Sequence, residues 1–347
     1  MSTWRDIWTE ASALDRAELL RKDDDWLATS WRSPRSWLVQ TVGPGRIAMA
    51  EQTSLPRLRP RGTFDAQRHF FLGTLAEQGA EPRAVFTTLE HEDALPEGLT
   101  AISLRTAVPQ LPGPEADIAV AATAICQWNH RDRFCPGCGN ASTVTDGGFA
   151  RWCDTCERFT FPRNDAAVIA AVLDDDDRIL LGHQKSWGGG RVSVLAGFVE
   201  SGESLEQAVH REIGEEVGVR LREVSYLGSQ PWPYPRSLMV AYFARAADTR
   251  VRVDDMEIVD ADWFTREQVA RVIAAQDDAV AASGRGASGW PDGAESTTRD
   301  VALGGVPISL PGPGTIARRL IEAWLADETG LSVPAQTPGS PDAPPHA

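Results

Sequence analysis

The chain has 347 residues, 42% of them hydrophobic and 24% charged, and a formal net charge of −15 at pH 7; this is the composition of a globular protein long enough for two domains. The acidic balance disfavours nonspecific binding to nucleic acid, which requires clustered Lys and Arg. Because no apolar run is long enough to span a membrane and the N-terminal sequence MSTWRDIWTE has no signal-peptide pattern, we expect a cytoplasmic protein with no membrane partner.

Residues 1–124 are expected to form a first domain. Trp-rich segments at 26–31 and 36–41 and strand-like segments at 83–88 and 100–104 predict a small α/β or α+β fold. Ala-rich residues 116–128 predict a helix that leads into the next module. This region has no catalytic spacing, and we interpret its aromatic residues as core rather than as a ligand platform.

Four of the five cysteines form two CxxC pairs, Cys135 with Cys138 and Cys153 with Cys156. Four thiolates complete the tetrahedral coordination of Zn²⁺ and leave no position for a catalytic water, so we predict a structural zinc in a ribbon over residues 125–162. A redox CxxC is the alternative, which the presence of two matched pairs disfavours. Cys126 stands apart and is interpreted as a small buried hydrophobe.

The pattern changes after Arg163. Apolar segments at 166–173 and 178–182 predict two strands, and the acidic run 174–177 between them is interpreted as a hairpin turn rather than a metal site. Further strands are expected at 192–196 and 240–244, and a further helix at 315–326.

The segment 197–219 predicts a loop followed by a helix. Ser204 and Gln207 form a capping box at the start of the helix, and Gly218 suits its end. Apolar residues recur every four positions and give the helix one core-facing stripe, made of Leu205, Val209, Ile213 and Val217.

Carboxylates crowd the same helix. Glu212 and Glu216 lie one turn apart with Glu215 beside them, and Arg211 can pair with Glu215 across four residues. Such carboxylates repel one another unless a cation joins them, and hard oxygen ligands suit Mg²⁺ or Mn²⁺. A solvated acidic face is the alternative, which the loop–helix–turn context makes the weaker interpretation.

The spacing is Gly197, five residues, Glu203, seven residues, then Arg-Glu-Ile-x-Glu-Glu-x-Gly-Val from Arg211 to Val219, and it resembles the Nudix box of the Nudix hydrolases. Farther on, SQPWPYPRS at 229–237 is similar to the SQPWPFPxS signature of the NADH pyrophosphatase subfamily, with Tyr234 in place of Phe. That subfamily joins a divergent N-terminal domain, a zinc ribbon and a catalytic domain, which matches the order of the modules here.

The resemblance implies an α/β (α+β) fold, with a Nudix α/β/α sandwich over residues 163–328 preceded by the ribbon and a Nudix-like N-terminal domain. A Gly-, Ala-, Ser- and Asp-rich insertion at about 273–300 is expected to be a mobile loop, and residues 329–347 a disordered tail. The family also implies a homodimer.

The resemblance assigns site residues as well. It implies Mg²⁺ or Mn²⁺ ligands at the Ala196 carbonyl, Glu212, Glu216 and Glu257, and a catalytic set of Arg211, Glu212, Glu215, Glu216 and Glu257, with Glu215 or Glu257 as candidate base. The implied substrate contacts are Phe198, Gln230, Pro231, Trp232, Pro233, Tyr234, Pro235, Arg236, Ser237, Ala317 and Arg105. Two ribbon positions depart from relatives: Gly148 and Phe161 stand where some members have a substrate-contacting Glu and Tyr.

We therefore predict metal-dependent hydrolysis of the diphosphate of NADH or NAD⁺ to NMN(H) and AMP. Removal of NAD caps from RNA by the same bond chemistry and hydrolysis of ADP-ribose are alternatives, and a non-catalytic nucleotide sensor is disfavoured by the complete box. A basic groove would favour RNA.

Overall fold

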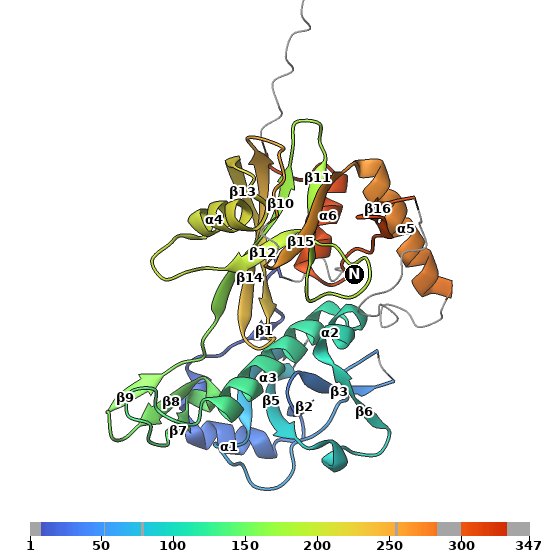
Figure 1. Cartoon of the computed structure of the whole chain (residues 1–347). Helices are drawn as coiled ribbons and strands as arrows, with labels where there is room; N and C mark the ends of the chain where they lie inside the picture. Colours follow the sequence, from blue (N-terminus) through green and yellow to red (C-terminus); the bar gives the residue numbers. More distant parts are fainter. Residues whose placement is uncertain (1–7, 52, 78–79, 254–255, 283–299, 332–347) are drawn as a thin grey trace, which may run out of the picture.

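The computed structural model describes residues 8–51, 53–77, 80–253, 256–282 and 300–331. The chain forms two lobes, each built on a six-stranded mixed sheet (Figure 1). Within the described residues, no helix is both long and apolar enough to cross a bilayer.

The sheet of the N-terminal lobe has the order β1-β4-β5-β2-β3-β6. Its strands are β1 (Leu14–Asp15), β2 (Trp37–Val42), β3 (Arg46–Ala50), β4 (Phe70–Glu77), β5 (Ala80–Glu90) and β6 (Leu99–Ser103). The helices are α1 (Asp24–Arg32), α2 (Leu104–Ala107) and α3 (Gly113–Arg131). Leu27 and Trp31 of α1 pack against Phe71 and Phe86 on one face, while α3 packs on the other face in a separate core. The strands and helix predicted for this region, and the aromatic core, are confirmed.

The ribbon follows α3 directly and consists of three short antiparallel strands, β7 (Thr143–Thr145), β8 (Ala150–Cys153) and β9 (Arg158–Thr160). Gly148, in the turn before β8, has φ +105 and its Cβ position lies 2.8 Å from the Phe70 side chain of the N-terminal sheet. This close approach excludes the Glu that some relatives carry there and seats the ribbon on the N-terminal lobe.

The second lobe has the order β13-β14-β10-β11-β15, with β12 paired to β10. Its strands are β10 (Asp165–Leu173), β11 (Ile179–Gln184), β12 (Leu195–Phe198), β13 (Leu221–Trp232), β14 (Ser237–Ala246) and β15 (Ile258–Phe264), with a small hairpin β16 (Ala302–Leu303) and β17 (Val306–Pro307). Helix α4 (Leu205–Val217) covers one face. Helices α5 (Arg266–Ala282) and α6 (Ile316–Leu325) cover the other, which confirms the expected α/β/α sandwich.

Two sequence predictions differ from the structure, and the Pro-rich segment takes a form that the sequence analysis did not predict. Of the strand expected at 192–196, only Leu195 and Ala196 belong to β12. The Pro-rich segment at 229–237 is the end of a long hairpin, because Ser229–Trp232 continue β13 and Ser237 begins β14. The insertion predicted as mobile from about 273 is helical to Ala282, where Gln276 is buried and bonds the backbone of Leu310; the rest of that insertion, 283–299, and most of the predicted tail, 332–347, lie outside the described residues.

Candidate active site

Helix α4 begins and ends as its sequence predicts. The Ser204 hydroxyl accepts from the Gln207 N–H at 3.2 Å, the Gln207 side chain accepts from the Ser204 N–H at 2.8 Å, and Gly218 ends the helix at φ 68. Val209, Ile213 and Val217 are buried against the sheet. These caps and the apolar stripe fix the rotation of α4, so that Glu212 and Glu216, which flank the stripe, lie on the side of the helix that meets the sheet.

Arg211 organises the box. Its guanidinium bonds Glu203, contacts Glu212 at 2.9 Å and Glu215 at 3.2 Å, and donates to the Phe198 carbonyl at 2.9 Å. The predicted pair with Glu215 is confirmed, and the contacts to Glu203 and Glu212 extend it. The Arg211 side chain thus joins the box loop to the helix. Its hydrogen bonds to Glu203, Glu212 and Glu215 raise the pKa of Arg211.

Glu212 lies against the backbone of β12. A Cβ on Gly197 would stand 1.9 Å from the Glu212 carboxyl carbon, so only glycine leaves room for this carboxylate beside Ala196. Burial raises the pKa of Glu212, and the negative charges of Glu215 and Glu257 raise it further. The positive charge of Arg211 acts in the opposite direction, but the net shift of the Glu212 pKa is upward. Glu257, remote in sequence, therefore belongs to the same electrostatic cluster, and Glu216 is buried nearby on the same helix, with 5% of its surface exposed.

The donor set suits a hard divalent cation. Carboxylate oxygens and a backbone carbonyl are ligands that Mg²⁺ and Mn²⁺ accept, and a cation would relieve the mutual repulsion that raises the pKa of Glu212. The box carboxylates are nevertheless more widely spread than the cysteines. Within the described ranges, only the four cysteines place three or more ligand atoms all within 4.8 Å of one another.

Gly197→Ala is expected to lower kcat about 100-fold or more without unfolding the protein, because the new methyl group displaces the Glu212 carboxylate. Gly214→Ala is the matched control, since nothing lies within 4 Å of its Cβ position on α4. The control should keep full activity and gain about 0.5–1 kcal/mol of stability. Steady-state kinetics and urea unfolding of both variants make the comparison, and equal activity in the two would contradict the steric argument.

A cavity of about 490 Å³ opens beside β12 and receives residues from both lobes. It brings together four of the predicted substrate residues, Arg105, Gln230, Trp232 and Ala317. Sequence reasoning did not identify its other polar and apolar walls, which include Ile169, Arg191, Ser193, Met239 and Thr315. Ile169 pairs with Ala196 of β12, so the cavity lies one strand from the start of the box, although no residue of 197–219 is in its lining. Phe198, at 59% exposure, lies at the surface outside its lining.

Arg105 is the charged side chain that the N-terminal lobe contributes to this cavity, next to Ser103, Thr106 and Pro109. Its guanidinium carbon lies 5.2 Å from the Trp232 ring centre and 5.0 Å from that of Tyr234. Two aromatic residues of the Pro-rich signature thus hold a cation from the other domain at the cavity wall. Nothing in the local sequence around Arg105 indicates this, since the contact joins residues far apart in the chain.

The rest of the signature is placed elsewhere. Tyr234 packs against the N-terminal core, and burial raises its pKa. Arg236 pairs with Asp165 at 2.8 Å. The remaining positions line a second cavity of about 420 Å³ on another side of the hairpin, namely Pro231, Pro233, Pro235 and Ser237, together with Trp232 and Arg236.

Gln230 is buried and clips the hairpin to the start of α6. Its amide donates to the Gly314 carbonyl at 2.8 Å and accepts from the Ile316 N–H at 2.7 Å. Gln230→Ala is expected to cost about 2 kcal/mol, because both backbone groups lose their partner in a buried setting. Urea unfolding measures the change in the free energy of unfolding, with Gln110→Ala, at a partly exposed position, as the control. Equal losses of stability in the two variants would contradict a specific stabilising role for the Gln230 hydrogen bonds.

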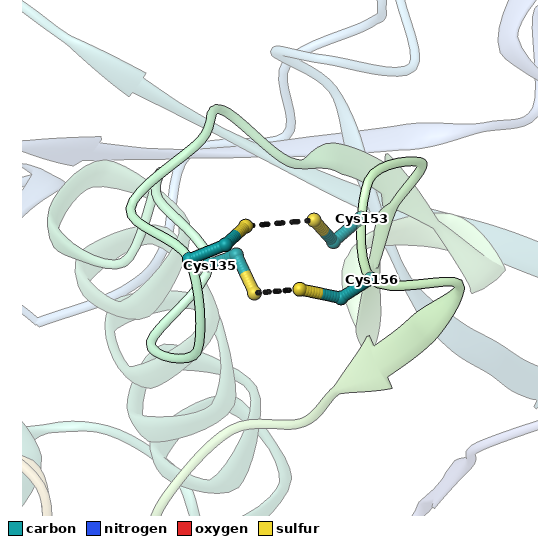
Figure 2. A group of neighbouring side chains, drawn as sticks. Cys135, Cys153 and Cys156 are labelled. Carbon is teal, nitrogen blue, oxygen red and sulfur yellow. Dashed lines mark hydrogen bonds between the residues drawn. The ribbon is translucent and has the colours of Figure 1, made fainter.

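The four paired cysteines converge in the ribbon (Figure 2). The sulfurs of Cys135 and Cys156 are 3.8 Å apart and those of Cys138 and Cys153 3.6 Å. These separations are far longer than a disulfide and equal the edges of a sulfur tetrahedron around Zn²⁺ with bonds of about 2.3 Å. N–H groups of Gly137 and Cys138 lower the pKa of Cys135 to about 6. Cys126 is buried on α3 and does not join this cluster, as predicted.

Phe161, the second departure, is 60% exposed and stacks on Phe159 with ring centres 6.2 Å apart. It lies on the ribbon surface, and neither described cavity beside the hairpin includes it in its lining.

Comparison with known proteins agrees with this architecture. A NUDIX domain model matches residues 163–283, and a model of the NADH pyrophosphatase-like rudimentary NUDIX domain matches residues 19–128. The NAD-capped RNA hydrolase NudC of Mycobacterium bovis is 34% identical over 320 residues, covering 90% of this chain and 93% of its own length; NudC of Mycobacterium tuberculosis aligns to the same extent.

The human NAD-capped RNA hydrolase NUDT12 is 43% identical over 173 residues, or 47% of this chain. The aligned part spans 37% of the human protein. Since the mycobacterial alignment extends over nearly the full length of both chains, the chain belongs to the NADH pyrophosphatase-like, or NudC-type, subfamily of the Nudix hydrolases.

Proposed function

We propose that this protein hydrolyses the diphosphate bond of NADH or NAD⁺ to NMN(H) and AMP with Mg²⁺ or Mn²⁺. The observation that carries the proposal is the approach of the Glu212 carboxylate to Gly197 of β12, with Glu215 and Glu257 near enough to raise its pKa, together with a cavity that both lobes line. An α4 face crowded with acidic side chains suits metal-assisted attack on a phosphate, and the cavity provides room for a nucleotide.

The cation would be held by Glu212, Glu216, Glu257 and the Ala196 carbonyl, and when bound it neutralises the diphosphate and acidifies an attacking water. Arg211 fixes the box loop through Glu203 and the Phe198 carbonyl. Glu215 and Glu257 are the candidates for accepting the proton of that water. At the cavity wall Trp232 offers a ring for stacking, and Arg105 offers a positive charge to the substrate phosphates.

We further propose that the cysteine cluster holds one structural Zn²⁺. Four thiolates leave no open coordination position, so the metal would stabilise the ribbon rather than take part in hydrolysis. A homodimer, implied by the family resemblance, completes the proposal.

NAD-capped RNA is the second candidate substrate, because the NudC and NUDT12 relatives are named for that activity and the bond to be broken is the same. The test compares release of AMP from NADH, hydrolysis of ADP-ribose and decapping of an NAD-capped RNA, each with Mg²⁺, with Mn²⁺ and with chelator. Metal-dependent cleavage of NADH is expected. Absence of cleavage of all three substrates would overturn the proposed activity and favour the nucleotide-sensor alternative.

A further inference from the structure

A cavity of about 770 Å³ lies apart from the box, between the N-terminal sheet, α3 and the ribbon. Four arginines line it: Arg68 before β4, Arg131 at the end of α3, Arg133 after it and Arg151 on β8. Two histidines, His91 and His130, add to the wall, and Glu90 is the one acidic side chain in the described lining. In a chain of net charge −15, this is a local concentration of positive charge.

These arginines are not neutralised by the protein. Among the described residues, none of the four forms an ion pair with a carboxylate. Arg133 bonds His130, and Arg151 bonds Asn129 and Ser142. Within the described part of the chain, the guanidinium groups of Arg68 and Arg131 have no hydrogen-bond partner, so both are available to an external anion.

The apolar lining of the cavity and its position beside the hairpin tip indicate the kind of ligand it would bind. Phe70 and Leu89 also line the cavity and add apolar surface, on which a base could pack while its phosphate meets the arginines. Gln127 lines the cavity and donates to the Pro233 carbonyl at the hairpin tip at 3.3 Å. Trp232, the residue before Pro233, lines the cavity beside the box, so the hairpin tip contacts the walls of both cavities.

We propose that this basic cavity binds the phosphodiester backbone of single-stranded RNA a few nucleotides from its capped end. The inference rests on the proposed function, since the capped end would occupy the cavity beside the box while the chain passes the hairpin tip. A free dinucleotide such as NADH ends before the basic cavity and does not need it. Arg68 and Arg131 therefore distinguish RNA substrates from free dinucleotides.

The test uses the full-length protein and the double variant Arg68→Ala/Arg131→Ala. The control is Arg32→Ala/Arg250→Ala, which removes the same charge at exposed positions outside the cavity lining. Binding of an uncapped 5′-hydroxyl RNA 12-mer, which is not a substrate, is followed by fluorescence anisotropy over a series of salt concentrations, with AMP as a second ligand. Hydrolysis of NADH and of an NAD-capped RNA is measured for each protein.

Loss of two phosphate contacts should weaken RNA binding about tenfold or more and reduce the slope of log K against log salt by about 1.4. kcat/KM for NAD-capped RNA should fall in parallel, through KM, while NADH hydrolysis and the control pair remain at wild-type values. The RNA assignment would be overturned if the double variant kept the wild-type salt slope, or if the control pair lost as much RNA affinity as the double variant. It would also be overturned if the double variant lost affinity for AMP but bound RNA as tightly as the wild type. Wild-type protein that binds RNA through these arginines but cleaves no substrate would instead refute the proposed function and leave the RNA surface standing.

Discussion

Glu216→Gln is expected to reduce kcat for NADH by about a thousandfold while the fold remains intact. The substitution keeps the shape of the side chain but removes the negative charge that would bind the divalent cation. A metal contributes several kcal/mol of transition-state stabilisation, and each tenfold in rate corresponds to about 1.4 kcal/mol. Glu216 lies in the last turn of α4, and its neighbours Ile213 and Val217 are buried, so the helix is expected to keep its position in the variant.

Glu206→Gln is the matched control. It changes the same residue type on the same helix, at an exposed position whose contact is with the Tyr242 hydroxyl. Circular dichroism and zinc content should show that the wild type, Glu216→Gln and Glu206→Gln are all folded. Steady-state kinetics should show that only Glu216→Gln has lost activity. A folded Glu216→Gln protein with near-normal turnover at saturating Mn²⁺ would refute the role assigned to this carboxylate.

Cys135→Ser is expected to remove zinc from the protein and to lower its thermal stability sharply. Binding of a structural Zn²⁺ contributes about 10–16 kcal/mol in zinc-finger peptides, so the loss of one of four ligands is expected to remove several kcal/mol. The effect should extend beyond the ribbon, because the turn at Gly148 packs on Phe70 and its carbonyl accepts from Asn129 of α3 at 2.9 Å. The N-terminal lobe is therefore expected to lose stability as well.

Cys126→Ala tests whether the effect belongs to the metal site. This thiol is buried on α3, and Thr87 lies 3.4 Å from its sulfur, so its removal should cost only about 1 kcal/mol. Zinc should remain at one per chain in this control and be absent from Cys135→Ser, as measured by atomic emission and a thermal melt. A Cys135→Ser protein that folds normally without zinc would contradict a structural role for the metal.

The parts of the molecule that could be predicted from sequence depend on neighbouring residues. The capping box of Ser204 and Gln207, the Gly218 terminus and the Arg211–Glu215 pair are interactions across three or four positions, where helix geometry alone decides which side chains meet. The zinc-type cluster follows similarly from two CxxC pairs, because each pair brings two thiolates together within one turn. Apolar segments likewise predicted most strands.

Tertiary structure decided the contacts between segments that are distant in the chain. The approach of Gly197 to Glu212, the position of Arg105 between Trp232 and Tyr234, and the clip from Gln230 to α6 all join separate elements. The resemblance implied substrate contacts along the whole Pro-rich signature, yet only Gln230 and Trp232 of it line the cavity beside the box. The rest forms a hairpin tip next to the N-terminal lobe, because only the packed domains show which side of the hairpin is buried. The basic cavity has the same origin. A net charge of −15 disfavours RNA when charges are merely summed, whereas the fold gathers arginines 68, 131, 133 and 151 into one wall, and electrostatic attraction depends on the distances between charges rather than on their total.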